Sequence, residues 1–129
     1  MNFTFLSVKH AIEIQHEQID LNGGEHGVRD VTLLESAIAT PRASFGGELL
    51  HPTIFAAGAA YLFHIVQNHP FIDGNKRAGL ATAVVFLKVN GFTLEMDDDA
   101  LLELVLRVAT GQALKPEIEA AFREHSRLD

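Results

Sequence analysis

Apolar residues recur at the spacing of an α-helix along most of this chain, and the strict alternation typical of a half-buried strand is almost absent. Ser7 and Asp30 are suited to cap helices, and Gly or Pro residues follow where the periodic stretches end. The pattern predicts six helices, over residues 8–21, 31–40, 52–67, 75–89, 97–109 and from 116 into the charged tail "REHSRLD". The predicted fold class is an all-α bundle of about six helices.

The third predicted helix is apolar on nearly all sides, which is typical of a helix at the centre of a bundle. We expect Pro52 to stand in its first turn. The glycine-rich segment before it, residues 42–50, predicts an exposed loop or a short hairpin. A chain of 129 residues is long enough for one hydrophobic core, so residues 1–129 are predicted to form a single domain.

Composition excludes several classes of function. The chain has no cysteine, and its seven histidines never stand four residues apart, which disfavours a disulfide framework, a thiolate site or a metal site made only of histidines. A net charge of −7 without a basic stripe argues against nucleic acid as a direct partner. The most apolar run, 54–66, is too short to cross a bilayer, and we expect a cytoplasmic protein without a membrane segment.

The segment "NHPFIDGNKRAG", residues 68–79, interrupts two long apolar patterns and leads into a predicted helix. The N-terminus of a helix offers unpaired N–H groups and the positive end of a dipole, which together favour anions. Gly74 permits a tight turn there, Asn75 carries an amide donor, and Lys76 and Arg77 add two cations. This combination predicts a phosphate-binding site.

Two further residues of the loop carry reactive groups. Asp73 supplies a carboxylate where Mg²⁺ would bridge protein and phosphates, and His69 is suited to accept a proton near neutral pH. Phe71 is expected to point into the core and fix the loop. For each residue alone a structural role is the alternative: Asp73 as a helix cap, and the cations as solvated surface charges. The complete set favours phosphoryl or nucleotidyl transfer.

The remaining histidines give weaker signals. His64 stands within an apolar helical stretch, and we interpret it as a core histidine with satisfied hydrogen bonds. The other five histidines form no recognisable constellation, and surface roles are expected for them: His10, His16, His26, His51 and His125. The triple aspartate 97–99 is interpreted as a helix start, because no calcium-binding loop follows it.

"HPFIDGNKR" resembles the signature of the Fic/Doc family, His-x-Phe-x-Asp/Glu-Gly/Ala-Asn-Gly/Lys-Arg. Lysine at the eighth position, where adenylyl-transferring members carry glycine, is similar to the Doc (death-on-curing) branch. "GVRDVTLLESAIATPRASFGG" and "AVVFLKVNGF" also resemble Doc-type chains, so the similarity covers most of the sequence.

The resemblance implies a role for each motif residue. His69 would be the general base for a hydroxyl of a target protein, Asp73 would hold Mg²⁺, and Phe71 would be structural. The phosphates of ATP would be bound by four residues: Gly74, Asn75, Lys76 and Arg77. Doc-type toxins are understood to transfer the γ-phosphate of ATP to a threonine of elongation factor Tu and so to block translation. The long ammonium at Lys76 fits that reaction, because it fills space that a glycine leaves to the α- and β-phosphates.

Two departures from the Fic pattern are informative. Many Fic proteins have a second arginine three residues after the motif arginine, where this chain has Leu80. Their inhibitory Ser/Thr-x-x-x-Glu-Gly/Asn segment is matched only by residues 44–48, which Leu49 follows. Without a built-in inhibitor, a Phd-like antitoxin is the implied partner. "SFGGELLHP", residues 44–52, is instead a candidate flap for docking the target protein, with an ordinary connecting loop as the alternative. The flap residues would be Phe45, Gly46, Gly47 and Leu49.

Three hypotheses follow. The first is a toxin of a toxin–antitoxin pair that acts as an ATP-dependent protein kinase. The second keeps the fold but transfers AMP to a protein hydroxyl. The third is a catalytically inactive Fic/Doc-like binding module, which the complete motif disfavours.

Overall fold

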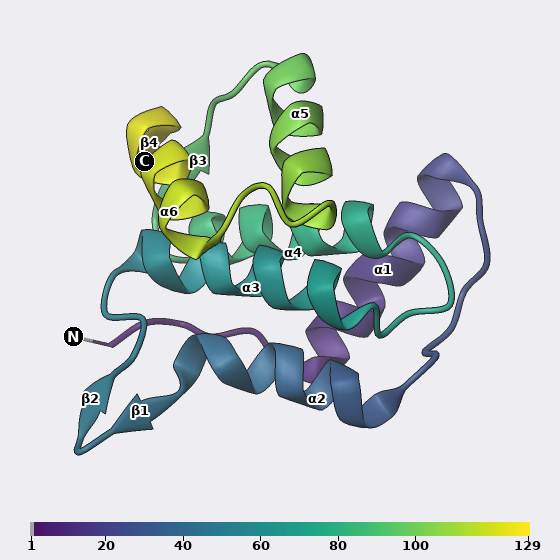
Figure 1. The fold of residues 1–129 in the computed structure, drawn as a ribbon, viewed down its shortest axis with the longest axis horizontal. Coiled ribbons are helices and arrows are strands. Elements are labelled where there is room, and N and C mark those ends of the chain that lie inside the picture. The colour runs from purple at the N-terminus through teal and green to yellow at the C-terminus, as the bar shows by residue number, and fades with distance from the viewer. Residues whose placement is uncertain (1) are drawn as a thin grey trace.

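The computed structural model describes residues 2–129, and most of them are helical (Figure 1). Over these residues the chain forms six α-helices: α1 (Val8–Asn22), α2 (Val31–Ala39), α3 (Ile54–Asn68), α4 (Asn75–Val89), α5 (Asp98–Ala109) and α6 (Lys115–His125). A short 3₁₀ helix, η1 (Thr40–Arg42), follows α2. The predicted all-α class is confirmed.

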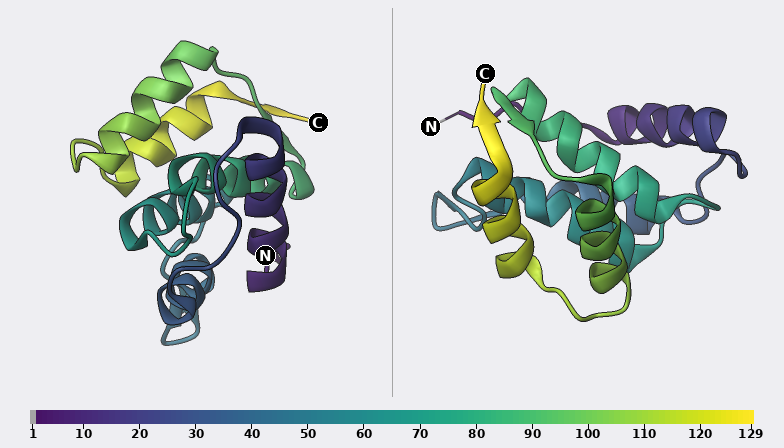
Figure 2. Two further views of the ribbon diagram at one scale, coloured as in Figure 1. Left: turned by 90° about the vertical axis from the view of Figure 1, so that its right-hand side faces the viewer. Right: turned by 90° about the horizontal axis from the view of Figure 1, so that it is seen from above.

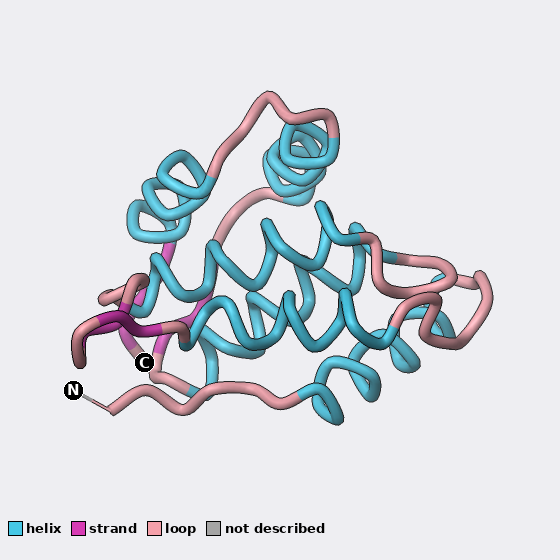
Figure 3. Tube along the Cα trace, turned by 60° about the horizontal axis from the view of Figure 1, so that its bottom comes forward, coloured by secondary structure: helices cyan, strands magenta, loops and turns pink. Residues whose placement is uncertain are grey.

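The long helices α3 and α4 form the centre of the molecule. Helix α2 lies on one side of them, α5 and α6 cover the other, and α1 packs along α4 (Figures 1 and 2). Among residues 2–129 no helix is long and apolar enough to cross a membrane. The turn between α3 and α4, which carries the motif, lies at one end of the central pair, as the views in Figures 1 and 3 agree.

Small residues allow α3 and α4 to approach closely. Four alanines of α3 are buried, and a Cβ atom added to Gly58 would lie 3.2 Å from a methyl group of Leu87. On the other helix, a Cβ atom added to Gly79 would lie 3.0 Å from a methyl group of Val66. Because close-packed interiors tolerate little added volume, these glycines set the distance between the two helices.

Side-chain caps begin three of the helices. Ser7, Asp30 and Thr53 accept hydrogen bonds from the N–H groups three residues further on, at the starts of α1, α2 and α3. The first two caps were predicted from the sequence. The prediction for Pro52 is wrong, because this proline precedes the Thr53 cap and stands outside α3.

Two small antiparallel sheets join the helical elements. Strands β1 (Ser44–Phe45) and β2 (Glu48–Leu49) form the short hairpin that was one of the two predicted forms of this segment. Gly46 and Gly47 occupy its turn with φ of 61° and 85°, the positive values that a two-residue hairpin turn favours. Strands β3 (Phe92–Leu94) and β4 (Ser126–Leu128) attach the end of the chain to the segment after α4. The second pair was not predicted.

Candidate active site

The motif loop begins with a strained residue, His69. It terminates α3 with φ 52° and ψ 51°, and among residues 2–129 it is the one non-glycine residue with positive φ. The left-handed conformation costs a non-glycine residue about 1–3 kcal/mol, so surrounding contacts must hold it. It also turns the chain out of the helix before Pro70, which leaves the side chain of His69 exposed at the mouth of the turn.

Residues 24–30, which we call the backing segment, hold the motif loop in this shape. The Arg29 guanidinium donates to the carbonyl oxygen of His69 at 2.7 Å and to that of Asn68 at 3.1 Å. The N–H groups of Arg29 and Asp30 donate to the carbonyl of Pro70. Together these bonds fix the backbone on both sides of the strained residue. Sequence analysis did not identify Arg29, because nothing near it in the chain signals a contact forty residues away.

A second set of contacts fixes the middle of the loop. Phe71 is fully buried, as expected, and forms a β-bridge with Val28. The side-chain amide of Asn75 accepts from the N–H of Phe71 at 2.9 Å and donates to its carbonyl at 3.1 Å. Asn75 is itself 4% exposed, so its amide braces the loop. One amide hydrogen remains beyond these two bonds, which limits the donation to an oxyanion that the sequence suggested.

The carboxylate of Asp73 has a defined orientation. One oxygen accepts from the N–H of Gly74 at 2.9 Å, and the other accepts from the N–H of Glu25 in the backing segment at 3.2 Å. The buried side chain of Gln15 donates to the backbone carbonyl of Asp73 at 3.1 Å. Gly74, not Asp73, is the N-cap of α4, and no side chain caps this helix. Asp73 is nevertheless exposed, so its carboxylate remains available to a cation.

Gln15 is a functional residue that sequence analysis missed. Its amide also donates to the carbonyl of Glu25 at 3.4 Å, so one side chain joins α1, the backing segment and the motif loop. A polar residue on the buried face of an amphipathic helix was the available signal, because burial of an amide requires hydrogen-bond partners.

The start of α4 combines backbone donors with two cations. The first intrahelical bond runs from the N–H of Ala78 to the carbonyl of Gly74, which leaves three earlier N–H groups without an acceptor in the helix. Among residues 2–129, neither Lys76 nor Arg77 takes part in an ion pair. The Arg77 guanidinium lies beside Gly74, where a Cβ atom would be 3.4 Å from its nitrogen. The two cations at this helix end thus have no acidic partner within ion-pairing distance in the described part of the chain.

These groups surround one cavity of about 200 Å³. Its lining includes the side chains of both reactive residues and the cationic start of α4: Val66, His69, Ile72, Asp73, Gly74, Asn75, Lys76 and Arg77. The structure therefore brings together the motif residues that the sequence singled out, apart from the buried Phe71. A base, a carboxylate and an anion-binding helix end that share one small cavity suit transfer of a phosphorus-containing group.

A larger groove of about 620 Å³ adjoins this cavity. It lies between α1, α4 and α5 and shares Lys76 and Arg77 with the cavity. Its apolar lining includes Leu80, Leu101 and Leu102, and Leu102 is 59% exposed.

The β1–β2 hairpin does not cover the cavity. It precedes α3, whereas the motif loop follows it, and Figures 1 and 3 place the two at opposite ends of this helix. A helix of 15 residues is about 22 Å long. Phe45, 82% exposed at the hairpin tip, is therefore remote from the reacting groups, and the role of the hairpin in docking the target protein stays a prediction. Any docking by this hairpin takes place far from the transferred group.

A separate cluster of titratable groups lies between α3 and the start of α6. The Lys115 ammonium nitrogen is 2.9 Å from Nε2 of His64 and 3.1 Å from Nε2 of His51. Burial, reinforced by Lys115 and then by His51, lowers the pKa of His64 to about 4. Burial and Lys115 also lower the pKa of His51, and burial lowers the pKa of Lys115 itself. His64 is thus partly buried and hydrogen-bonded, as predicted, but the expectation of an unconnected surface role for His51 is wrong.

Comparison with known proteins identifies the family of this chain. The model of the Fic/DOC family matches residues 5–87, which include the whole motif. The chain is 41% identical over 90 residues to Toxin Doc of Mycolicibacterium smegmatis, a match that covers 68% of this chain and 69% of that protein. It is 31% identical over 107 residues to Protein kinase doc of Escherichia phage P1, covering 83% of each. The chain belongs to the Fic/Doc family, and the two relatives support its Doc branch.

Proposed function

We propose that this protein is a toxin that transfers the γ-phosphate of ATP to a threonine or serine hydroxyl of a target protein. The observation that carries the proposal is the single cavity in which His69, Asp73 and the cationic start of α4 converge. The names of the two relatives, Toxin Doc and Protein kinase doc, support the same proposed function. By resemblance to Doc proteins, elongation factor Tu is the proposed target, and arrested translation is the proposed consequence.

His69 is the proposed general base. In the transfer, the target oxygen forms a bond to the γ-phosphorus, the bond from that phosphorus to the bridging oxygen breaks, and ADP leaves. The hydroxyl proton passes to the His69 imidazole, which stands exposed at the cavity rim. The contacts of Arg29 keep the residue at this position.

The residues present fit a magnesium-bound phosphate chain. Mg²⁺ prefers oxygen ligands and uses few from the protein, and Asp73 offers an exposed carboxylate held by two backbone N–H groups. When bound, the ion neutralises phosphate charge during transfer. A cavity of about 200 Å³ suits phosphates rather than a whole nucleotide, so the nucleoside extends beyond it. The N–H groups of α4, Lys76 and Arg77 bind the phosphate oxygens.

We further propose that a Phd-like antitoxin silences the protein by occupying the groove beside the cavity. An apolar segment with acidic residues complements its leucines and the two shared cations, and its presence removes Lys76 and Arg77 from the phosphates. Replacement of Leu102 by Glu is expected to weaken antitoxin binding, whereas Leu128→Glu, at a leucine of β4 that is 71% exposed against 59% for Leu102, leaves it unchanged. Equal affinities of the two variants for the antitoxin would exclude the groove as its binding site.

The test of the reaction is a paired labelling experiment. Purified protein, Mg²⁺ and elongation factor Tu, or a cell extract, are incubated with ATP labelled on either the γ- or the α-phosphate. We expect the γ label alone to reach one protein band, and His69→Ala to abolish transfer. Transfer of the α label would replace the kinase with an adenylyltransferase. If cells expressing His69→Ala still show toxicity, an inactive binding module would explain that toxicity better than catalysis.

A further inference from the structure

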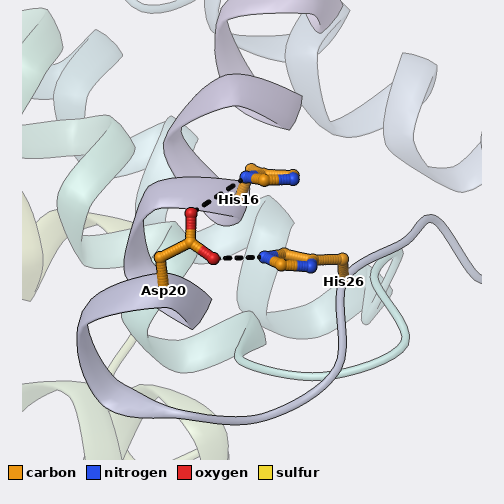
Figure 4. Close-up of side chains that lie close together, drawn as sticks. All are labelled: His16, Asp20 and His26. Carbon is orange, nitrogen blue, oxygen red and sulfur yellow. Dashed lines mark hydrogen bonds and ion pairs between the residues drawn. The ribbon is translucent and has the colours of Figure 1, made fainter.

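Two histidines and one aspartate form a cluster on α1 and the backing segment (Figure 4). His16 and Asp20 stand one turn apart on α1, and His26 lies opposite them on the backing segment. Nδ1 of His16 is 3.2 Å from one carboxylate oxygen of Asp20, and Nε2 of His26 is 2.8 Å from the other. The two rings are stacked, with centroids 3.7 Å apart and planes 9° from parallel. The prediction that these histidines form no constellation is therefore wrong.

The geometry points to a binding site for a divalent transition-metal ion, and we propose Zn²⁺ as its occupant. The three ligand atoms, two imidazole nitrogens and a carboxylate oxygen, all lie within 4.8 Å of one another. Ligand atoms at about 2.1 Å from tetrahedral Zn²⁺ are roughly 3.4 Å apart, so the nitrogens need to move little, but the stacked rings must tilt toward each other to direct both lone pairs at one ion. The side chains are 58%, 58% and 42% exposed, which leaves room for this tilt and for water as a fourth ligand.

The donor set selects the class of metal. Two imidazole nitrogens with one carboxylate suit Zn²⁺ and its neighbours in the transition series, whereas Mg²⁺ prefers oxygen ligands in octahedral geometry. The site therefore differs in chemistry from the single carboxylate of Asp73 in the cavity. Zinc binding requires that each imidazole present a bare nitrogen to the ion in place of its hydrogen bond to Asp20.

Without metal, the same geometry is explained by a carboxylate that accepts one hydrogen bond from each imidazole. That arrangement is exposed to water, and exposed pairs of this kind contribute little to stability, so it does little to hold the two segments together. A bound metal ion adds coordinate bonds that link α1 to the backing segment, and we call this link the clip. The two explanations differ in one measurable quantity, the affinity of the cluster for Zn²⁺.

The clip would act on the candidate active site through the backbone. His26 follows Glu25, whose N–H donates to the Asp73 carboxylate, and precedes Gly27, whose carbonyl accepts from the N–H of Ile72 at 3.0 Å. Fixing His26 to α1 therefore restricts the segment that orients the motif loop. This inference rests on the cluster and these contacts alone, and it holds whichever group the enzyme transfers.

The first experiment is calorimetric titration of the tag-free full chain with ZnCl₂ at pH 7.5, and with MgCl₂ as the comparison. We expect one zinc ion per chain and at least about tenfold weaker binding in His16→Gln and in His26→Gln, since even the loss of an outer contact to a zinc ligand costs that much. His125→Gln is the matched control, because His125 is exposed at the end of α6 and its imidazole bonds to the carbonyl of Ala121 in the same helix. Undiminished binding in both cluster variants, or equal affinity for Mg²⁺, would overturn the proposal.

A second readout tests the coupling to the motif loop. Zinc is expected to slow amide hydrogen exchange at Glu25 and Ile72 in the wild-type chain, and to leave both rates unchanged in His26→Gln. The measurement needs neither nucleotide nor target protein, so failure of the proposed kinase activity does not affect it. Zinc binding without slower exchange at these two amides would show that the metal does not restrain the backing segment, and would refute its proposed coupling to the motif loop.

Discussion

The stability of the protein is expected to decrease with acidification in a range set by His64. Burial, Lys115 and His51 hold the pKa of this imidazole at about 4, against an ordinary value of 6.5. Between these two values the unfolded chain binds a proton that the folded chain does not. Stability therefore falls as the pH decreases from about 6.5 to about 4, and above that range His64 contributes no pH dependence.

The size of the effect follows from the shift. At about 1.4 kcal/mol per pKa unit, the difference between 6.5 and about 4 gives an upper bound of roughly 3.5 kcal/mol. His64 is only partly buried, so water screens part of this energy, and we expect about 1.5 kcal/mol. Its ring nitrogen can accept from Lys115 only in the neutral form, so protonation also places two cations 2.9 Å apart.

Urea denaturation between pH 4 and pH 7 measures this contribution directly. The wild-type chain is compared with His64→Gln, which removes the titrating group, and with His125→Gln, which removes an exposed imidazole from α6. The stability difference between wild type and His64→Gln is expected to shift by about 1.5 kcal/mol toward the variant as the pH falls, with no comparable shift for His125→Gln. A difference that is constant over this range would refute the assigned pKa and the role of burial.

Three further substitutions test the support of the motif loop. Arg29→Ala should strongly reduce the rate of phosphate transfer and cost about 1 kcal/mol of folding stability, because two exposed charge-assisted hydrogen bonds are lost. An unchanged transfer rate would show that Arg29 does not support the active site. Asn75→Ala should lower the free energy of unfolding, measured by urea denaturation, by about 1–3 kcal/mol, because the buried N–H and carbonyl of Phe71 lose their hydrogen-bond partners. A smaller decrease would mean that water replaces the amide. Gly24→Ala would place a Cβ atom 2.8 Å from Oδ2 of Asp73 and should therefore weaken Mg²⁺ binding. Gly46→Ala is the control, because Gly46 also has positive φ but no neighbour within 4 Å of the added Cβ atom. Equal Mg²⁺ affinity of the two variants would show that the added Cβ atom at Gly24 does not disturb Asp73.

The helical framework was largely predictable because its signals are local. Periodicity and side-chain caps depend on residues within one or two turns of each other, and the starts of α1 and α2 agree with those signals. The β3–β4 pair was not predictable for the opposite reason. Its strands are three residues long, lie more than thirty residues apart, and pair through the backbone, so the charged sequence "SRL" carries no alternation to reveal β4.

The candidate site was predicted in its chemistry but not in its support. Nine consecutive residues supply the groups around the cavity, so the motif could be recognised along the chain. The orientation of Asp73 depends on the Gln15 side chain and on the N–H of Glu25. The contact with Glu25 involves only its backbone, so the identity of that residue could not predict it. His16 and Asp20 stand four residues apart on one helix, a spacing that could have drawn attention, but His26 joins them only through the path of the backing segment.

The contacts of His69 show why the motif is not an independent unit. Its left-handed backbone costs about 1–3 kcal/mol, and the bonds that offset this cost come from Arg29, in a different part of the chain. The motif loop and the backing segment therefore form one mechanical element, in which a change to either displaces the reactive groups. A protein partner or a metal ion that restrains residues 24–30 would accordingly act on the site without touching a residue that lines the cavity. Regulation of this enzyme should be sought on the exposed side of the backing segment as well as in the groove beside the cavity.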